Sequence, residues 1–403
     1  MNTLLNNIKT AVLPMVVAGA LLASCNKGVD QFAIPTTTKS GITLDSTLRA
    51  NPNDSMYYRL VRIASNGTVN FVNLYNSTTS NNEYTLLVPD NAAMMASGFS
   101  SAVISATPVA TAAGIVSYNT IPQRYDTAGI GAGFPNFTVG TSIFPSPTAP
   151  FVTFRSYLSK RPGILRANTI PMTTPLNVKA FNGNIHHVAA IVAPPVTTTL
   201  WDRINADATP VTGLTYLRAA ILRADSGAVT PGPLQAALLN GGANLTVFAP
   251  TDAAFQALLT GAITQALIAQ GFPPATAAAT AATLAASPNV FQNPALFGAL
   301  SARTVRGILV THLFSNTAFT VNFPSVATNY PTLLNTDPAF AMHPGIRLQA
   351  TFAGPFVSAA TVRGAANASA SNILINPTAA TGTSDQFYVN GVIHKIDQVL
   401  LPQ

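Results

Sequence analysis

The sequence predicts an α+β protein in which two similar domains follow one another along the chain. Two short segments recur in the same order in each half, and a pattern of helical spacing precedes the first segment both times. Short apolar stretches bounded by turn-forming residues indicate strands around these helices. Because the repeat is far longer than the roughly 20–50 residues of a solenoid unit, it indicates two domains.

The composition allows a large core and argues against two classes of protein. Of the 403 residues, 48% are apolar and 8% are charged, against about 25% charged in an ordinary soluble domain. Disorder combines low hydrophobicity with high charge, so we do not expect it here. Beyond the first 25 residues, no run of about 18 apolar residues lacks a polar interruption, so we do not expect an integral membrane protein either.

The positive net charge reflects scarce acids rather than a basic surface. Lys and Arg number 20, Asp and Glu number 13, and Glu83 is the only glutamate. The basic residues are scattered, and no stretch has the Lys- and Arg-rich character that phosphate binding needs. We therefore expect no nucleic-acid partner.

The N-terminus predicts export and a lipid anchor. Residues 1–24 resemble a signal peptide, because Lys9 precedes an apolar stretch that is too short to span a bilayer. The sequence LASC at 22–25 resembles a bacterial lipobox, so we predict lipidation of Cys25 and a polar tether over 25–41. An ordinary secretory signal with a coincidental cysteine is the alternative.

Lipidation would attach the mature chain to a membrane. Several acyl chains give stable attachment where a single chain is marginal. We expect an outer-membrane lipoprotein of the cell envelope that faces either the cell surface or the periplasm. Since Cys25 is the only cysteine, a disulfide within one chain is impossible.

The recurring segments define the two predicted domains, 42–195 and 199–403. In each domain an apolar stretch leads to a proline and the start of a helix, and a later apolar stretch begins with Asn-Gly and contains His. The link between the domains is short and rich in proline and threonine. The first segments are Leu87–Met94 and Phe248–Phe255, and the second segments are Asn182–His186 and Asn390–His394.

Helical patterns accompany both domains. In each, apolar residues at helical spacing precede the first segment, around residues 57–63 and 214–221. The first pattern stops at Ser-x-Gly (65–67) and the second at Ser-Gly (226–227). The second domain is longer because it contains an alanine-rich insertion near 261–287. Alanine favours helix and Pro273-Pro274 would interrupt it, so we predict a helical hairpin there.

Local signals support a strand followed by a capped helix. Each apolar stretch ends at a proline, Pro89 or Pro250, which lacks the N–H that continued strand pairing needs. Thr251 or Asp252 can then cap the helix that follows, since its side-chain oxygen can accept a hydrogen bond from an unpaired backbone N–H.

A hairpin is predicted near the C-terminus. Asn390-Gly391 lies between the apolar stretches Phe387–Val389 and Val392–Leu400. Asn-Gly at such a place is a strong hairpin signal, because both residues of the turn need positive φ.

These segments resemble the two hallmark segments of the fasciclin-like domain, which have the approximate forms T-V-F-A-P-T-x-x-A-F and N-G-x-I-H-x-I-D-x-V-L. Thr246–Phe255 and Asn390–Leu400 match almost fully, whereas Thr85–Met94 and Asn182–Val192 match more loosely. The chain thus resembles a tandem fasciclin-like lipoprotein of Bacteroidetes-type bacteria. The resemblance implies two antiparallel β-wedges with packed helices, and a role in adhesion or matrix association without a catalytic mechanism.

The family also has a Tyr-His pair after its central helix, and adhesion in animal members has been assigned to that region. Here the first domain has Tyr118-Asn119 and the second has Thr311-His312, so neither domain has both residues and integrin-type binding is poorly supported. A loop after a rigid helix can still present polar groups to a partner. We therefore predict an exposed interaction surface at these positions, above all at Thr311-His312.

Five histidines are candidates for metal binding or general-base chemistry: His186, His187, His312, His343 and His394. His186 and His394 each share a strand face with apolar residues, and no carboxylate or thiol recurs beside them. We therefore expect neutral, hydrogen-bonded core histidines. Neighbours on a strand point to opposite faces, so His186 and His187 would not bind one metal together.

The motifs favour a protein without catalytic activity. The sequence has no HExxH, GxSxG, P-loop or dinucleotide-binding turn, and we expect no cofactor and no metal. We favour an adhesion or interaction module with a protein or extracellular polysaccharide partner. A polysaccharide-binding accessory lipoprotein of a nutrient-uptake system is the main alternative, and an enzyme is the third. Three Asp-Ser/Thr-apolar triplets, at 45–47, 54–56 and 126–128, also resemble bacterial O-glycosylation acceptors.

The lipid anchor gives a first testable prediction. Cys25→Ala should abolish acylation, because the chain has no other thiol to accept an acyl group. The measurement is incorporation of labelled fatty acid in cells that express the chain. Labelling of the variant at the level of the unchanged chain would contradict the predicted anchor.

Overall fold

In each half of the chain, the two recurring segments form neighbouring parallel strands. β1 (Tyr84–Pro89) pairs with β7 (Gly183–Val188), and β8 (Leu245–Pro250) pairs with β15 (Gly391–Ile396). Every residue of these four strands is buried. The expectation of purely antiparallel sheets is wrong for these pairs. Each pair joins the first and last strands of its half across a long connection, which is the condition that parallel pairing needs.

The computed structural model describes residues 41–78, 82–134, 138–145, 153–161, 163–207, 213–377 and 382–402. The predicted signal peptide, Cys25 and all but the last residue of the predicted tether lie outside this part of the chain. Residues 41–77 and 82–403 belong to one compact unit.

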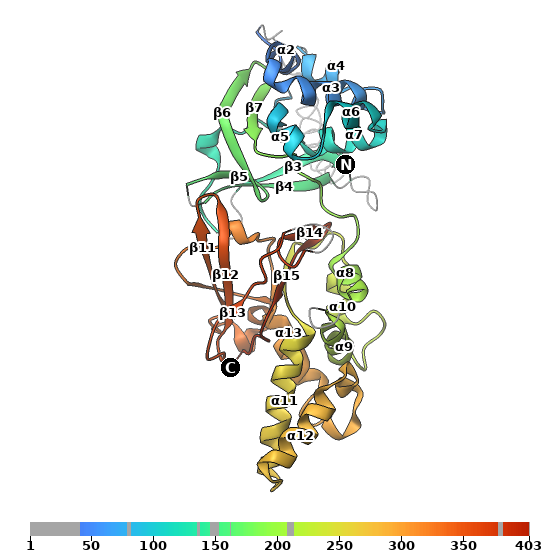
Figure 1. Cartoon of the computed structure of the whole chain (residues 1–403), viewed down its shortest axis with the longest axis vertical. Coiled ribbons are helices and arrows are strands. Elements are labelled where there is room, and N and C mark those ends of the chain that lie inside the picture. The colour runs from blue at the N-terminus through green and yellow to red at the C-terminus, as the bar shows by residue number, and fades with distance from the viewer. Residues whose placement is uncertain are drawn as a thin grey trace, which may run out of the picture. The chain divides into compact units, whose positions relative to one another are not determined.

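Within the described residues, the first half forms one sheet with strand order β2-β1-β7-β6-β5-β4-β3. The β1–β7 pair is parallel, and the other neighbouring pairs are antiparallel. Helices of this half gather beside β6 and β7 (Figure 1). The remaining elements are α2 (Leu44–Ala50), η1 (Pro52–Asp54), α3 (Ser55–Ala64), α4 (Phe71–Asn76), α5 (Asn91–Ala96), α6 (Ser101–Ala106), α7 (Val109–Tyr118), β2 (Thr120–Ile121), η2 (Thr127–Gly129), β3 (Thr138–Pro145), β4 (Thr153–Lys160), β5 (Leu165–Ala167) and β6 (Ile170–Ala180).

The apolar spacing around residue 57 does form a helix. α3 buries Tyr57, Leu60, Val61 and Ala64, which recur at the three- and four-residue steps of one helical face. This face shares a core with side chains of β1 and β7. Burial of a large apolar side chain stabilises the fold by roughly 2 kcal/mol, so the face fixes the helix against the parallel pair.

The second half has two four-stranded sheets among its described residues, with strand orders β14-β15-β8-β9 and β10-β11-β12-β13. All of the neighbouring pairs in these sheets except β8–β15 are antiparallel. The elements are α8 (Leu200–Ala206), α9 (Thr215–Ala224), α10 (Pro233–Leu239), α11 (Asp252–Ala269), α12 (Pro274–Ala285), η3 (Pro288–Gln292), η4 (Pro294–Leu296), α13 (Ala302–Thr311), β9 (Leu313–Phe314), η5 (Thr320–Asn322), β10 (Thr328–Tyr330), η6 (Leu333–Thr336), η7 (Pro338–Phe340), β11 (Ile346–Ala353), β12 (Phe356–Gly364), β13 (Ser371–Asn372) and β14 (Gln386–Tyr388).

The parallel pair of the second half is buried on both faces. Val247 and Ile393 belong to the core that contains the helices, whereas Phe248 and Ile396 belong to the core on the β11–β12 sheet. Successive strand residues point to opposite faces, so both cores draw on the same two strands. This explains why β8 is apolar at every position except Thr246 instead of alternating regularly with polar residues.

The alanine-rich insertion forms the hairpin of α11 and α12, which lie side by side in Figure 1. α11 already begins at Asp252, and Pro274 is the first residue of α12, where its missing N–H is harmless. By length and composition α11 could cross a membrane, a test that the core helix of a soluble protein also passes. Its residues Phe255, Leu259 and Ile263 pack into the helical core.

The hairpin near the C-terminus is confirmed, but its turn is displaced by one residue. β14 pairs with β15 so that Tyr388 lies opposite Gly391, which leaves Val389 and Asn390 as the turn. Gly391 is the first strand residue, with φ of +147°, and a Cβ atom there would lie 1.9 Å from the Leu245 carbonyl oxygen. The glycine is therefore required by the close approach of β8 rather than by the turn.

The segment that links the two halves also pairs with β14. The Val196 N–H donates to the Phe387 carbonyl, and the Val389 N–H donates to the Val196 carbonyl. A short stretch of the linker is thereby held in extended form beside the second half.

A second prediction concerns Gly391. Gly391→Ala should lower the free energy of unfolding by about 3 kcal/mol, because the new methyl group clashes with the backbone of β8 and the backbone is strained. Gly307→Ala in α13 is the matched control. Apart from its chain neighbours and the backbone of its own helix, no atom lies within 4 Å of a Cβ at that position. Because alanine also favours helix, the stability of this variant should stay the same or rise slightly. Urea denaturation measures both variants, and equal stabilities would contradict the close approach.

Candidate functional site

The asparagine of each Asn-Gly sequence ties the parallel strands to two helices. Asn390 Oδ1 accepts from the N–H of Leu200, the first residue of α8, at 2.9 Å, and its Nδ2 donates to the carbonyl of Leu238 in α10 at 2.7 Å. The side chain thus satisfies one free N–H at a helix start and one free carbonyl at a helix end.

Asn182 makes the same two contacts in the first half. It accepts from the N–H of Leu44, the first residue of α2, and donates to the carbonyl of Tyr75 in α4, both at 2.9 Å. The following Gly183 also lies against the facing strand, since a Cβ there would be 2.1 Å from the Tyr84 carbonyl oxygen. The Asn-Gly sequence therefore has the same structural role in both halves.

The histidine of each second segment is buried and bonded at both ring nitrogens. His394 Nδ1 accepts from the Asp385 N–H at 3.1 Å, so its Nε2 carries the proton and donates to the Ala318 carbonyl at 2.9 Å. His186 accepts from the Asn177 N–H at 3.2 Å and donates to the Tyr125 carbonyl at 2.7 Å. Burial lowers the pKa of both histidines, so both are neutral in the fold.

A threonine on the first strand of each half, β1 or β8, bonds to the same loop that the buried histidine of that half contacts. Thr246 Oγ1 donates to the Asn316 carbonyl at 2.6 Å and accepts from the Ala318 N–H at 2.8 Å. Thr85 makes the equivalent bonds to the Gln123 carbonyl at 2.7 Å and the Tyr125 N–H at 2.8 Å. The loop after the central helix is thus fixed from both parallel strands at once.

The predicted exposed surface at Tyr118-Asn119 and Thr311-His312 does not exist. The exposed fraction is 0% for Tyr118, Asn119 and Thr311 and 1% for His312. α7 and α13 run directly into β2 and β9, which pair with β1 and β8, so these residues enter the core instead of a surface loop.

His312 and Asn119 both link the end of the central helix to the chain after the last strand. His312 Nδ1 donates to the Ile308 carbonyl at 2.9 Å, and its Nε2 accepts from the Leu400 N–H at 2.8 Å. Asn119 donates to the carbonyls of Ile115 at 2.9 Å and Val192 at 3.0 Å. Burial lowers the pKa of His312 to about 4, so this ring is also neutral.

The residues after each first segment cap two helices. Thr251 is the N-cap of α11 and accepts from the Ala254 N–H, as predicted for this position. The Asp252 carboxylate accepts from the Tyr216 N–H at 2.9 Å and from the Thr215 hydroxyl at 2.6 Å, and so caps α9. In the first half Asp90 caps α5, and Asn91 accepts from the Met56 N–H of α3.

The residue that follows each of these histidines is also buried, on the opposite face of the strand, and contacts a carboxylate. His187 contacts the Asp54 carboxylate and the Pro175 carbonyl, both at 2.9 Å, and Lys395 Nζ lies 2.5 Å from Asp207. Burial alone would lower the pKa of His187, but its hydrogen bonds to these acceptors and the Asp54 charge raise it. Sequence reasoning missed both pairs, because the partners are far apart in the chain.

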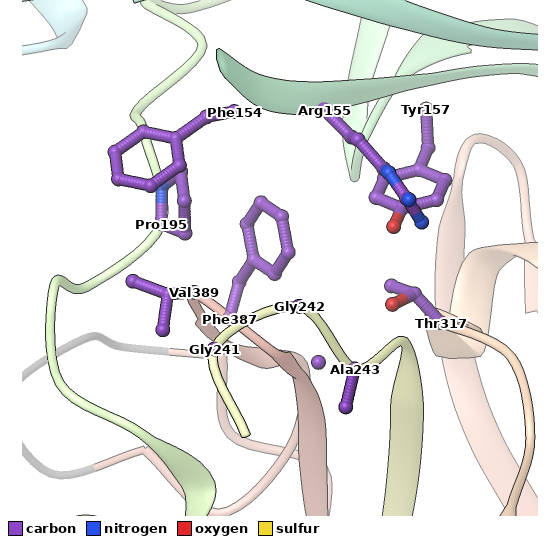
Figure 2. A pocket seen from close by; sticks show the side chains of 11 residues that line it. Phe154, Arg155, Tyr157, Pro195, Gly241, Gly242, Ala243, Thr317, Phe387 and Val389 are labelled. Atoms are coloured by element: carbon purple, nitrogen blue, oxygen red, sulfur yellow. The ribbon is translucent and has the colours of Figure 1, made fainter. Parts of the chain in front are cut away.

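A small cavity lies where β4 meets the second half. Figure 2 shows Phe387 standing between Phe154 on one side and Tyr157 on the other. The cavity measures about 60 Å³, which suits ordered water rather than a larger ligand. Tyr157 Oη donates to Asn244 Oδ1 at 2.9 Å, and burial raises the pKa of Tyr157. We interpret this place as a packing seam and not as a binding site.

The described residues contain no group of three or more His, Cys, Asp or Glu side chains that could hold a metal ion. Of the five histidines, four take part in the buried contacts given above. The fifth, His343, is partly buried and accepts from the Gly345 N–H through Nδ1 at 3.0 Å.

Comparison with known proteins adds little to this geometry. No protein-family model matches the chain, and no curated protein matches it either. Among solved structures, it is similar to a FAS1 domain pair from the insect cell adhesion molecule fasciclin I. The identity is 16%, the match covers 86% of this chain and 96% of that chain, and the TM-score is 0.31. A likeness of this strength carries no argument about fold or function.

A third prediction concerns His394. His394→Ala should lower the free energy of unfolding by about 1–3 kcal/mol, because it leaves the Asp385 N–H and the Ala318 carbonyl without their partner. Thermal and urea denaturation measure the loss. A variant that unfolds like the unchanged chain but loses a stoichiometric metal would contradict the structural role.

A fourth prediction concerns acid. The folded-state pKa of His312, about 4, lies below its ordinary value of about 6.5, so the unfolded chain takes up the proton first as pH falls. Stability present above pH 6.5 is lost as pH falls towards 4. His312→Asn, which introduces the residue found at position 119, should remove about 2 kcal/mol of the loss between pH 7 and pH 5. Urea denaturation at each pH tests this, and identical pH profiles would refute it.

Proposed function

We propose that the chain is a non-enzymatic, lipid-anchored protein of the cell envelope, in which two tandem fasciclin-like domains mediate adhesion or interaction with a protein or matrix partner. The observation that carries the proposal is the recurrence of one set of buried hydrogen bonds on the hallmark residues of both halves.

The recurrence supports two domains with the predicted limits, 42–195 and 199–403. In both halves the side chain at each of these positions, or its substitute, bonds to the backbone of the corresponding segment. Chance similarity of short motifs would not produce this recurrence. The atom differs in one pair, because Asn119 donates to the Val192 carbonyl whereas His312 accepts from the Leu400 N–H. The equivalent pairs are Thr85 and Thr246, Asn91 and Asp252, Asn119 and His312, Asn182 and Asn390, and His186 and His394.

The same contacts favour an interaction role over catalysis. A catalytic acid or base must reach a substrate with its polar atoms. The ring nitrogens of His186, His312 and His394 are instead bonded to backbone groups in the core. We infer that the hallmark residues build a rigid scaffold, and that the outer surface meets the partner.

The anchor and the location rest on the sequence of the N-terminus, which lies outside the described residues. A lipid on Cys25 followed by a polar tether would hold the folded part close to an outer membrane. Neutral hydroxyl and amide side chains in place of charge suit an adhesive surface outside the cytoplasm.

A polysaccharide-binding accessory lipoprotein is the second candidate. One specific observation favours it. A surface groove on α9 is lined by Arg218 and Arg223 together with amide and hydroxyl side chains.

A fifth prediction tests the proposed function on intact cells. On intact cells, added protease should cleave the full chain if the chain faces the cell surface. In a separate assay, the purified chain should bind saturably to whole cells or envelope material. Cys25→Ala should lose membrane attachment while purified variant keeps the saturable binding, because the anchor and the binding surface are separate. If neither the unchanged chain nor the Cys25→Ala variant binds saturably, an adhesion or interaction role is contradicted.

A further inference from the structure

A groove of 520 Å³ opens on the second half beside α9 and η3. This volume falls in the range of small-molecule binding sites. The groove is lined by two arginines, two phenylalanine rings, and amide and hydroxyl side chains. The lining residues used below are Arg218, Arg223, Ser226, Asn289, Gln292 and Phe297.

Arg223 is held in a fixed position at the groove. Its guanidinium carbon lies 3.7 Å from the centre of the Phe297 ring, and its Nε donates to the Leu300 carbonyl at 2.8 Å. A guanidinium stacked on a ring keeps its outward N–H groups in one plane. Within the described part of the chain, the two terminal amino groups of Arg223 have no hydrogen-bond partner.

The described residues that line the groove include no Asp or Glu, and the nearby carboxylates have other partners. The Asp225 carboxylate is buried, and it pairs with Arg306 at 3.1 Å and accepts from the Leu234 and Gln235 N–H groups. Asp252 is also buried, and its oxygens face the Thr215 hydroxyl and the Tyr216 N–H. Arg218 is exposed and forms no ion pair with another described residue.

We propose that this groove binds the carboxylate groups of an acidic polysaccharide. A planar guanidinium with two outward amino groups matches a carboxylate in bidentate fashion. Asn289, Gln292 and Ser226 supply the donors and acceptors that sugar hydroxyls need. A nucleic acid fits less well, because its phosphate chain needs a longer row of cations than two arginines. The inference rests on the proposed interaction function and names its ligand class.

The test compares two polymers with the same backbone. Polygalacturonate carries free carboxylates, whereas its fully methyl-esterified form does not. Affinity electrophoresis or titration calorimetry with the full chain should detect binding of the first polymer and not of the second. The double variant Arg218→Gln/Arg223→Gln should bind polygalacturonate at least tenfold more weakly. Arg223→Lys should also weaken binding, because an ammonium group cannot form the planar pair.

Arg347→Gln is the matched control, since Arg347 is exposed on β11 and outside the groove. Arg347→Gln removes one positive charge, as each of the two groove substitutions does. It should leave the affinity for polygalacturonate unchanged. Equal binding of the methyl ester, or unchanged binding by the double variant, would overturn the proposal. Equal competition by inorganic phosphate at low concentration would also overturn it, by showing a general anion site.

Failure of the ligand class and failure of the proposed function give different results. Saturable binding to envelope material without binding to polygalacturonate would reject the acidic polysaccharide and keep the interaction role. Absence of binding to both would reject the interaction role itself.

Discussion

The close approach of two parallel strands constrains the rest of each half. At Gly391 the backbone of β15 lies so near the Leu245 carbonyl that no side chain fits, and Gly183 stands in the same relation to Tyr84. This contact fixes the register of the pair, because a slip by one residue would turn every side chain to the other face. With both faces buried, the asparagine before each glycine comes to lie between the start of one helix and the end of another.

The buried polar groups then join strands, loops and helices into one network. His394 and Thr246 hold the same loop residue, Ala318, through its carbonyl and its N–H. Networks of this kind specify one arrangement when every member is satisfied. In the first half Asn119 leaves its buried Oδ1 without a partner in the described part of the chain, which costs roughly 1–3 kcal/mol. At the equivalent position of the second half, both ring nitrogens of His312 have hydrogen-bond partners.

The sequence predicted what depends on near neighbours. The N-cap at Thr251, the strand that ends at Pro250 and the hairpin around Asn390 all follow from residues within a few positions. Parallel pairing was not predictable from local signals, because β8 and β15 meet across most of the second half. The same limit explains the error at His312. Whether a residue after a helix is exposed depends on the strand that follows it, and here β9 pairs with β8. The stacking of Arg223 on Phe297 likewise joins residues that no local pattern connects.

The side chains of Asn390, His394 and His312 act as internal links of the core. Native-state hydrogen exchange, followed by mass spectrometry, tests this role most directly. The amides of Leu200, Asp385 and Leu400 donate to the side chains of Asn390, His394 and His312, respectively. They should exchange as slowly as the amides of β8 and β15, because opening them requires loss of the core. Exchange as fast as that of the exposed turn at 325–326 would contradict this role.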